Sequence, residues 1–212
     1  MTEQSVEKPA APRRGRPPAS SREEIETVAI ELFLRKGFEE TTLAEITAAA
    51  GVSKTSFFRY FPSKGSIIWW RFDEFTAGFA EVLETSLTSQ DNTLDIIRAS
   101  MIAALQRVID AEGLWMQRFR VLDESTELRS EESEQWAAWR EHVASFTARR
   151  HGFAASDVAP QSIAGAVHGG YVAMLRRWLQ VENPGAELLP QLDAELRPLC
   201  RVLQSWLDDS CA

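Results

Sequence analysis

Apolar residues recur at intervals of three and four over most of the chain, a spacing that places them on one face of an α-helix. One such run is Ile25, Val28, Ala29, Leu32 and Phe33. The predicted helices lie within residues 21–37, 42–51, 53–60, 63–83, 92–108, 114–122, 130–150, 160–181 and 190–206. Because no stretch shows a convincing alternation of apolar and polar residues or a hairpin turn, the pattern predicts an all-α fold.

Residues that favour helix termini mark the ends of the first helices. Ser21 and Thr42 are each followed three residues later by a glutamate, which makes a capping box that satisfies free N–H groups at a helix start. Gly37 and Gly51 end the first two helices, and Pro62 breaks the third. Three short helices with a glycine between the second and third are typical of a helix-turn-helix, whose last helix lies in the DNA major groove.

The last of these three helices has an inward apolar face and an outward polar face. Val52 and Phe57 are placed to pack it against the preceding helix. The outward side chains are short and polar or long and cationic, namely Ser53, Lys54, Thr55, Ser56 and Arg59. Such side chains donate hydrogen bonds to phosphates and base edges, so this face predicts a DNA-reading helix. The alternative interpretation is a helical hairpin with an ordinary polar face.

A wider set of residues, from the first helix to the start of the fourth, is specific when taken together. These residues are Gly37-Phe38, Thr41-Thr42, Ile46, Ala50-Gly51-Val52-Ser53-Lys54, Phe57, Tyr60-Phe61 and Ser63-Lys64. The set resembles the signature of the TetR (tetracycline-repressor-like) family. The resemblance implies a homodimer of nine-helix chains, a ligand cavity in the C-terminal domain and dimerisation through the last two helices. By matching position, it also implies two kinds of DNA contact: Thr42, Tyr60 and Lys64 with phosphate, and Lys54, Thr55, Ser56 and Arg59 with bases.

Two positions depart from the usual pattern of the family. Phe58 stands where the family usually has tyrosine, so a hydroxyl that often bonds DNA is missing. Thr47 stands where a small alanine is common, at a close approach of two helices. The usual set of contacts therefore does not transfer in full at these two positions.

The first 19 residues are rich in proline and arginine and predict a disordered basic arm. Within it, Arg14-Gly15-Arg16-Pro17 matches the core of an AT-hook, whose guanidinium groups enter a narrow A·T-rich minor groove. The alternative is a solvated tail that attracts phosphate without sequence preference. Residues 1–65 hold ten Lys and Arg against nine Asp and Glu, whereas residues 66–212 hold thirteen arginines against twenty-two acids. Double-stranded DNA would therefore meet the N-terminal end.

Aromatic and methionine residues are frequent on the predicted helices after residue 65. Such stripes are usually ordinary core, but between the helices of a ligand-binding bundle they also suit a small apolar effector. The candidate lining residues are Phe75, Met101, Leu105, Trp115, Phe119, Trp139 and Tyr171. A weaker set of matches comprises Arg120-Val121-Leu122, Glu127-Leu128, Trp139-Arg140-Glu141, Ala148-Arg149-Arg150 and Arg177-Trp178-Leu179. These look like the family branch that includes the mycofactocin-system regulator, which suggests a long-chain acyl-coenzyme A ligand. The acidic charge of this part opposes an anionic headgroup unless local arginines receive it.

The last two predicted helices carry the candidate dimer interface. It combines an apolar stripe with small residues that let helices approach closely: Leu192, Leu196, Leu199, Leu203 and Trp206, with Gly165 and Gly169. A two-fold dimer places two recognition helices one turn of DNA apart, as a palindromic operator requires. The predicted organisation is a basic arm (1–19), a helix-turn-helix domain (20–65) and a ligand-binding and dimerisation domain (66–212).

Other classes of function find little support in the sequence. No apolar run has the length of a membrane span, and the first residues lack the apolar core of a secretory signal. Cys200 and Cys211 lack a metal-ligand spacing, His142 and His151 are nine residues apart, and no catalytic motif is visible. The sequence thus predicts a cytoplasmic, non-enzymatic repressor without cofactor or metal, released from its operator by a small apolar effector. A ligand-independent regulator and, less favoured, a helical carrier or enzyme are the alternatives.

Overall fold

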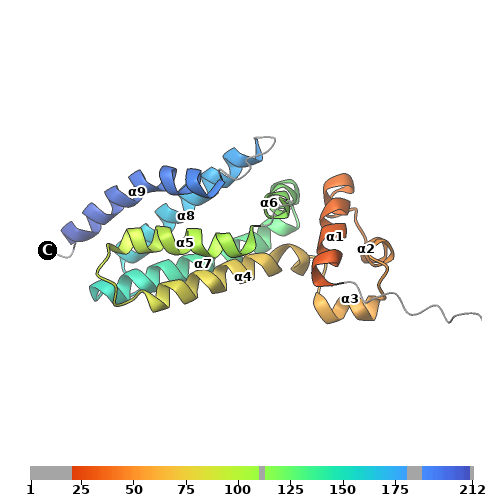
Figure 1. Ribbon diagram of the computed structural model, residues 1–212, viewed down its shortest axis with the longest axis horizontal. Coiled ribbons are helices and arrows are strands. Elements are labelled where there is room, and N and C mark those ends of the chain that lie inside the picture. Colours follow the sequence, from red (N-terminus) through yellow and green to blue (C-terminus); the bar gives the residue numbers. More distant parts are fainter. Residues whose placement is uncertain (1–20, 110–112, 181–187, 211–212) are drawn as a thin grey trace, which may run out of the picture.

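The computed structural model describes residues 21–109, 113–180 and 188–210, and every regular element in these ranges is a helix. The helices are α1 (Arg22–Lys36), α2 (Leu43–Ala49), α3 (Lys54–Tyr60), α4 (Ser66–Thr85), α5 (Thr93–Val108), α6 (Leu114–Glu124), α7 (Leu128–His151), α8 (Val158–Leu179) and α9 (Leu188–Ser210). Helices α1, α2 and α3 group at one end of the molecule, and α4 to α9 form an elongated bundle beside them (Figure 1). The all-α prediction is confirmed for the described part of the chain.

Helices α1 and α2 start at the predicted caps. The Ser21 hydroxyl accepts a hydrogen bond from the Glu24 N–H (3.1 Å), and the Glu24 carboxylate accepts one from the Ser21 N–H (2.9 Å). Thr42 and Glu45 form the same reciprocal pair at the start of α2. Gly51 has a φ of 65°, a left-handed conformation that glycine adopts without steric cost and that makes the turn from α2 to α3.

Four helices start at other residues than the pattern predicted. Helix α4 starts at Ser66 instead of residue 63, because Ser63 and Ser66 exchange hydrogen bonds in the turn before it. Helix α7 starts at Leu128 rather than at residue 130. Helices α8 and α9 each start two residues before the proline that was expected to open them, Pro160 and Pro190. Proline is tolerated in a first helical turn because the N–H groups there have no acceptor within the helix.

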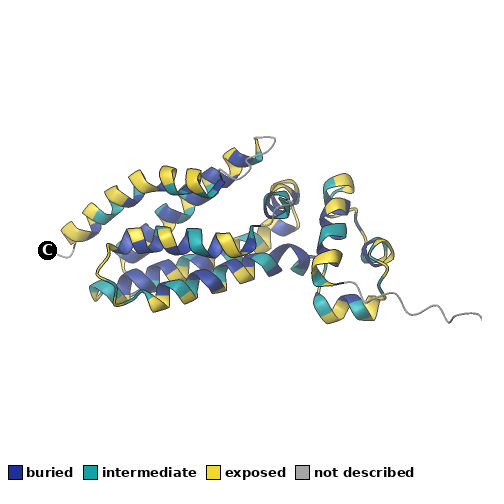
Figure 2. Ribbon diagram, viewed as in Figure 1, coloured by how far each residue is buried: buried dark blue, intermediate teal, exposed yellow. Residues whose placement is uncertain are grey.

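Buried residues line the inner faces of the bundle and continue into α1, α2 and α3 (Figure 2). In these three helices the buried side chains include Phe33, Ile46 and Phe57. Within the bundle, α4 packs against α5, α5 against α9, α7 against α8, and α8 against α9. Helix α6 packs against α1 and so joins the two parts. Among the described residues, no helix combines the length and the apolar character of a membrane span.

Helix α4 reaches from the small helical group to the middle of the bundle. Near its start, the Trp70 ring lies 6.3 Å from the Phe61 ring between centroids, and the Arg22 guanidinium of α1 lies 4.4 Å from the Trp70 ring. Further along, Phe75 and Phe79 are fully buried among the rings of the bundle. One helix of 20 residues therefore packs on both parts of the molecule.

Candidate nucleic-acid interface and aromatic core

Helix α3 lies at the edge of the molecule with one buried face (Figure 1). The Ser53 hydroxyl accepts a hydrogen bond from the Ser56 N–H (3.1 Å) and caps the helix. Phe57 is fully buried and holds α3 against the small core. The opposite side carries the predicted base-facing residues, of which Ser56 is half-buried and three are exposed: Lys54, Thr55 and Arg59. The structure thus brings these side chains together on one face of α3.

The guanidinium of Arg59 rests on the next side chain of the helix. Its Nη2 donates a hydrogen bond to the Tyr60 hydroxyl (3.1 Å), and its carbon lies 4.8 Å from the centre of the Tyr60 ring. Arg59 would have to turn away from Tyr60 to reach a base edge, whereas the pair as it stands presents donors that suit a phosphate. The division of these two residues into base and phosphate contacts stays a prediction.

Lys64 and Thr42, the other predicted phosphate contacts, both have partners inside the unit. The Lys64 ammonium donates to the carbonyl oxygens of Phe38 (2.7 Å) and Thr41 (3.3 Å), and lies 4.1 Å from the centre of the Phe38 ring. Since an ammonium has three donors, one remains for a phosphate. The Thr42 hydroxyl caps α2 by accepting from the Glu45 N–H (3.3 Å) and is exposed. Their contacts with DNA stay predictions.

Of the two residues that depart from the family pattern, Thr47 is buried and Phe58 is exposed. Thr47 is buried, and its hydroxyl is satisfied within α2 by donating to the carbonyl oxygen of Ala44 (3.1 Å). Phe58 is 51% exposed on α3, with its ring 5.5 Å from that of Phe57 in an edge-to-face contact. Arg14-Gly15-Arg16-Pro17 lies outside the described residues, so its minor-groove contact stays a prediction.

The predicted ligand-lining residues converge in the bundle, and all seven are buried: Phe75, Met101, Leu105, Trp115, Phe119, Trp139 and Tyr171. They come from α4, α5, α6, α7 and α8. The rings of the five aromatic residues among them contact one another, with centroid distances of 5.7 Å from Phe75 to Trp115 and 6.0 Å from Phe75 to Tyr171. The structure therefore joins them in one aromatic core, whose side chains are packed together. A role in ligand binding stays a prediction.

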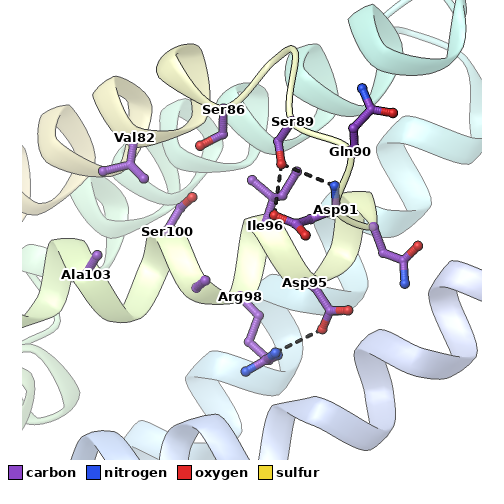
Figure 3. A pocket seen from close by; sticks show the side chains of 12 residues that line it. Val82, Ser86, Ser89, Gln90, Asp91, Asp95, Ile96, Arg98, Ser100 and Ala103 are labelled. Atoms are coloured by element: carbon purple, nitrogen blue, oxygen red, sulfur yellow. Dashed lines mark hydrogen bonds and ion pairs between the residues drawn. The ribbon is translucent and has the colours of Figure 1, made fainter.

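A cavity of about 600 Å³ lies elsewhere, between the end of α4 and the start of α5 (Figure 3). None of the predicted ligand-lining residues borders it. Its wall is polar as well as apolar: Ser86 and Val82 come from the α4 side, and the buried hydroxyl of Ser100 belongs to α5. At its rim, the Arg98 guanidinium pairs with Asp95 (2.9 Å). This open hollow is chemically unlike the apolar site that the sequence predicted.

A much smaller crevice, of about 20 Å³, borders the aromatic core between α6, α7 and α8. Phe119 lines it from α6, Trp136 from α7, and Val172 and Leu175 from α8. Arg176 belongs to the same lining and lies 3.8 Å from Asp123 across the crevice. Both charged and apolar side chains therefore line this crevice.

Comparison with known families decides the class of protein. Residues 91–204 match the family model described as the MftR C-terminal domain, and residues 25–68 match that of the bacterial regulatory proteins of the tetR family. The chain belongs to the TetR family. TetR-family proteins are transcriptional regulators that bind DNA through a helix-turn-helix, which in this protein lies within α1 to α3. The resemblance read from the sequence is thus confirmed.

Relatives of this TetR-family protein match over most of its length. The regulator of mycofactocin biosynthesis, MftR, from Mycobacterium tuberculosis (strain ATCC 25618 / H37Rv) is 32% identical over 82% of this chain and 88% of its own. The crystal structure of Thermus thermophilus FadR, a TetR-family repressor in complex with lauroyl-CoA, is 26% identical, with a TM-score of 0.54 over 84% of this chain and 93% of FadR. A TetR-family structure from Syntrophomonas wolfei is 18% identical, with a TM-score of 0.62 over 85% and 94%.

Dimers are typical of TetR-family proteins. On α9, some of the candidate interface residues are buried within the chain and others are partly exposed. Leu192 and Leu196 are buried in the core of the same chain, because α9 packs on α5 and α8. These two residues therefore do not lie on a surface that a second chain could reach, which corrects their assignment. Leu199 and Leu203 are half-buried, and Trp206 is 39% exposed.

The glycines of α8 also differ in whether they contact the same chain or face open space. A Cβ added at Gly170 would lie 2.9 Å from a methyl carbon of Leu199, so α8 and α9 of one chain touch at Gly170. Gly165 and Gly169 are exposed and face open space. The sequence predicted a close approach of helices at Gly165 and Gly169, whereas the structure places the contact within the chain at Gly170 and leaves the other two on a free face.

One residue of the aromatic core, His168, was missed as a functional candidate. His168 was not among the predicted site residues, yet its ring lies 4.6 Å from that of Trp136. Burial and, second, the charge of Arg140 lower the pKa of His168 to about 4. The available signal was its place on α8, three residues before Tyr171 and thus on a neighbouring helical position. A polar ring among aromatic side chains is where a ligand's polar group would bind.

Proposed function

We propose that this TetR-family regulator is a repressor that binds a palindromic operator as a homodimer and leaves it when a small apolar effector binds. One observation carries the proposal: α4 packs against Phe61 of the DNA-binding unit and also carries Phe75 and Phe79 into the aromatic core. A change in core packing would tilt α4 and displace α3 with it. In a dimer, that tilt alters the separation of two recognition helices that must fit successive major grooves.

The size of the required effect follows from linkage. An effector shifts the DNA-binding equilibrium only by the difference in its affinity for the two conformations. A hundredfold loss of DNA affinity needs about 2.7 kcal/mol of such coupling. Because the coupling is reciprocal, operator DNA must weaken effector binding by the same factor.

A long-chain acyl-coenzyme A is the first effector to test. The FadR repressor from T. thermophilus, 26% identical to this chain, is in complex with lauroyl-CoA. The crevice beside Trp136 has an apolar wall for an acyl chain and Arg176 at its edge for a phosphate. The net negative charge of residues 66–212 opposes an anionic headgroup, so Arg176 and its neighbour Arg177 would have to receive it.

A ligand-independent DNA-binding regulator is the second candidate, and the packing of the core favours it. The Phe75 ring contacts those of both Trp115 and Tyr171, so an effector must separate these rings before it can bind. Separating packed rings forfeits their mutual contacts, and the ligand has to offset that cost.

The remaining assignments belong to the same proposal. We assign DNA binding to residues 20–65, with Arg14 and Arg16 of the arm (residues 1–19) adding minor-groove contacts. Residues 66–212 would bind the effector and dimerise through the exposed face of α8 and α9. A regulator of bacterial DNA of this kind would act in the cytoplasm.

A mobility-shift assay and a titration test the two candidates together. The DNA upstream of the protein's own gene serves as operator, at fixed salt because phosphate contacts depend on it. Palmitoyl-CoA should release the protein, and calorimetry should show weaker palmitoyl-CoA binding when operator is present. Equal palmitoyl-CoA affinity with and without operator contradicts release by this ligand. DNA binding that no apolar ligand changes supports the second candidate, and failure to bind any upstream DNA contradicts both.

A further inference from the structure

Two buried ring nitrogens in the aromatic core have no hydrogen-bond partner among the described residues. They are Nε1 of Trp139 on α7 and Nε2 of His168 on α8. The centroids of the two rings are 6.3 Å apart, and the Trp136 ring lies 4.6 Å from His168 and 6.2 Å from Trp139. A buried polar atom without a partner costs free energy, so two of them in one place point to a missing partner.

The surroundings of His168 decide which ring nitrogen carries the proton. Nη1 of Arg140 lies 3.4 Å from Nδ1 of His168, and a guanidinium can only donate, so Nδ1 accepts. The lowered pKa of His168, about 4, keeps the ring neutral at pH 7. Its single proton is therefore on Nε2. Since the indole nitrogen of Trp139 is also a donor only, both unpartnered atoms are N–H donors that lack an acceptor.

The small crevice between α6, α7 and α8 is lined by Trp136, whose ring also contacts this donor pair. Val172 and Leu175 line the crevice, and they follow His168 by one and two helical turns on the same stripe of α8. Trp136 borders both the crevice and the His168 ring. Trp136 therefore lies between the crevice and the two donors.

We propose that Trp139 and His168 form a two-donor subsite for one neutral oxygen acceptor of the effector, such as the carbonyl oxygen of a thioester, ester or quinone. The inference rests on the proposed effector binding and adds the polar chemistry of the ligand to it. Two N–H donors match the two lone pairs of a carbonyl oxygen and repel an ammonium group. A pure hydrocarbon would leave both donors unpaired in an apolar surrounding and therefore binds more weakly.

The test compares ligands that differ only in the acceptor. Palmitoyl-CoA and S-hexadecyl-CoA share headgroup and chain length, but the second is a thioether without the carbonyl oxygen. Anthraquinone and anthracene form a second matched pair. Calorimetry on the full chain should show the carbonyl ligand binding about tenfold more tightly in each pair.

Substitutions assign that difference to the two donors. In Trp139→Phe and in His168→Leu, the advantage of the carbonyl ligand should fall below about threefold. His168→Gln should recover part of it, because the glutamine amide also donates. Trp70→Phe is the matched control and should keep the full advantage. Trp70 also has a buried indole N–H without an acceptor among the described residues, but it lies against Phe61, outside the core.

Two results would overturn the subsite. The first is equal affinity for both ligands of each pair in the unaltered protein. The second is a His168 ring with its proton on Nδ1, which nitrogen-15 NMR of the free protein distinguishes from the expected Nε2 form. If neither carbonyl ligand binds, the proposed effector function fails, while the NMR result still decides the donor geometry on its own.

Discussion

The carboxylate of Glu26 on α1 and the guanidinium of Arg118 on α6 form an ion pair buried where the DNA-binding unit meets the bundle. Their side chains are only 1% and 3% exposed. Nε of Arg71, on α4, lies 3.7 Å from the same carboxylate. Burial lowers the pKa of Arg118 to about 9, which is still above neutral pH, so the guanidinium is charged. Helices α1, α4 and α6 therefore meet at one carboxylate.

Removing one partner of this pair should destabilise the protein more than removing both. Glu26→Gln leaves the Arg118 charge buried without its counter-ion, and we expect the free energy of unfolding to fall by about 3–5 kcal/mol. Combining it with Arg118→Met should recover most of the loss, because the unpaired charge is then gone. Urea denaturation followed by circular dichroism measures both variants. Equal losses in the single and the double variant would show that the ion pair is not the cause.

Glu39, in the connection between α1 and α2, makes a second link between the two parts. Its Oε1 accepts hydrogen bonds from the Ser125 hydroxyl (2.8 Å), the Thr126 N–H (3.0 Å) and the Glu127 N–H (3.2 Å). These bonds, led by that from Ser125, lower the pKa of Glu39 to about 2. The carboxylate thus ties the α1–α2 connection to the turn between α6 and α7.

This second link should weaken in acid. Because folding lowers the pKa of Glu39 from 4.5 to about 2, its stabilisation is present above pH 4.5 and is lost as the pH falls toward 2. Glu39→Gln should lower the thermal midpoint at neutral pH and make its decline between these two pH values shallower. Ser125→Ala, which removes the leading hydrogen bond, should change the profile in the same direction. An unaltered profile in both variants would exclude this role of Glu39.

Local sequence signals predicted the ends of α1 and α2 well. A capping box acts between residues three apart, and the turn at Gly51 depends on one backbone conformation, so both are visible without tertiary structure. Proline is a weaker signal because it fits several positions of a first turn. Pro160 and Pro190 therefore marked the starts of α8 and α9 only to within two residues.

The sites were harder to predict because their partners are distant in sequence. Apolar spacing showed that Leu196 faces a core, but the same spacing fits a core within the chain and an interface with a second chain. Cationic residues were assigned to DNA, yet Lys64 also donates to the carbonyl oxygens of Phe38 and Thr41 within the same chain. The aromatic residues that the sequence grouped together are all buried in the bundle, and their role in ligand binding stays a prediction. How closely their rings pack depends on the separation of the helices, which no local pattern records.

Base reading by α3 makes the next prediction. Lys54→Ala and Arg59→Ala should each weaken specific operator binding by about 1–3 kcal/mol and relax the preference at one base pair. Circular dichroism should be unaltered, since both side chains are exposed. Arg201→Ala, an exposed arginine of α9, is the control and should bind as the unaltered protein does. Full operator affinity in both α3 variants would remove α3 from the DNA interface.

Assembly can be tested at a residue that the fold of one chain does not need. Val202 is 69% exposed on α9, so Val202→Glu should leave the helical content unaltered. If the exposed faces of α8 and α9 form the dimer, the substitution buries a charge there and shifts sedimentation toward the monomer. Gln106→Glu, at an exposed position of α5, adds the same charge elsewhere and should not. A complete dimer of the Val202 variant would place the interface on another face.

Phe58 gives the predicted DNA-binding face of α3 a large apolar side chain among polar ones. It lies four residues after Lys54 and three after Thr55, so the three side chains share one helical face. The edge-to-face contact with the buried Phe57 ring, at 5.5 Å between centroids, holds one side of the Phe58 ring and leaves the rest exposed. Among base edges in the major groove, an apolar side chain of this kind suits the C5-methyl group of thymine.

We therefore expect Phe58 to distinguish thymine from uracil in the operator. Replacing thymines one at a time by uracil removes only the methyl group, and at one position in each half-site the affinity should fall about threefold to tenfold, within the range of a single apolar contact. Phe58→Ala should bind more weakly and lose its sensitivity to that replacement, whereas Lys54→Ala should keep it. The measurement is a fluorescence-anisotropy titration of both proteins against both DNAs. The four titrations form a double-mutant cycle, in which the effects of removing two groups that touch each other are not additive. If thymine replacement weakens binding of the Phe58→Ala variant by the same factor as binding of the unaltered protein, another residue contacts the methyl group.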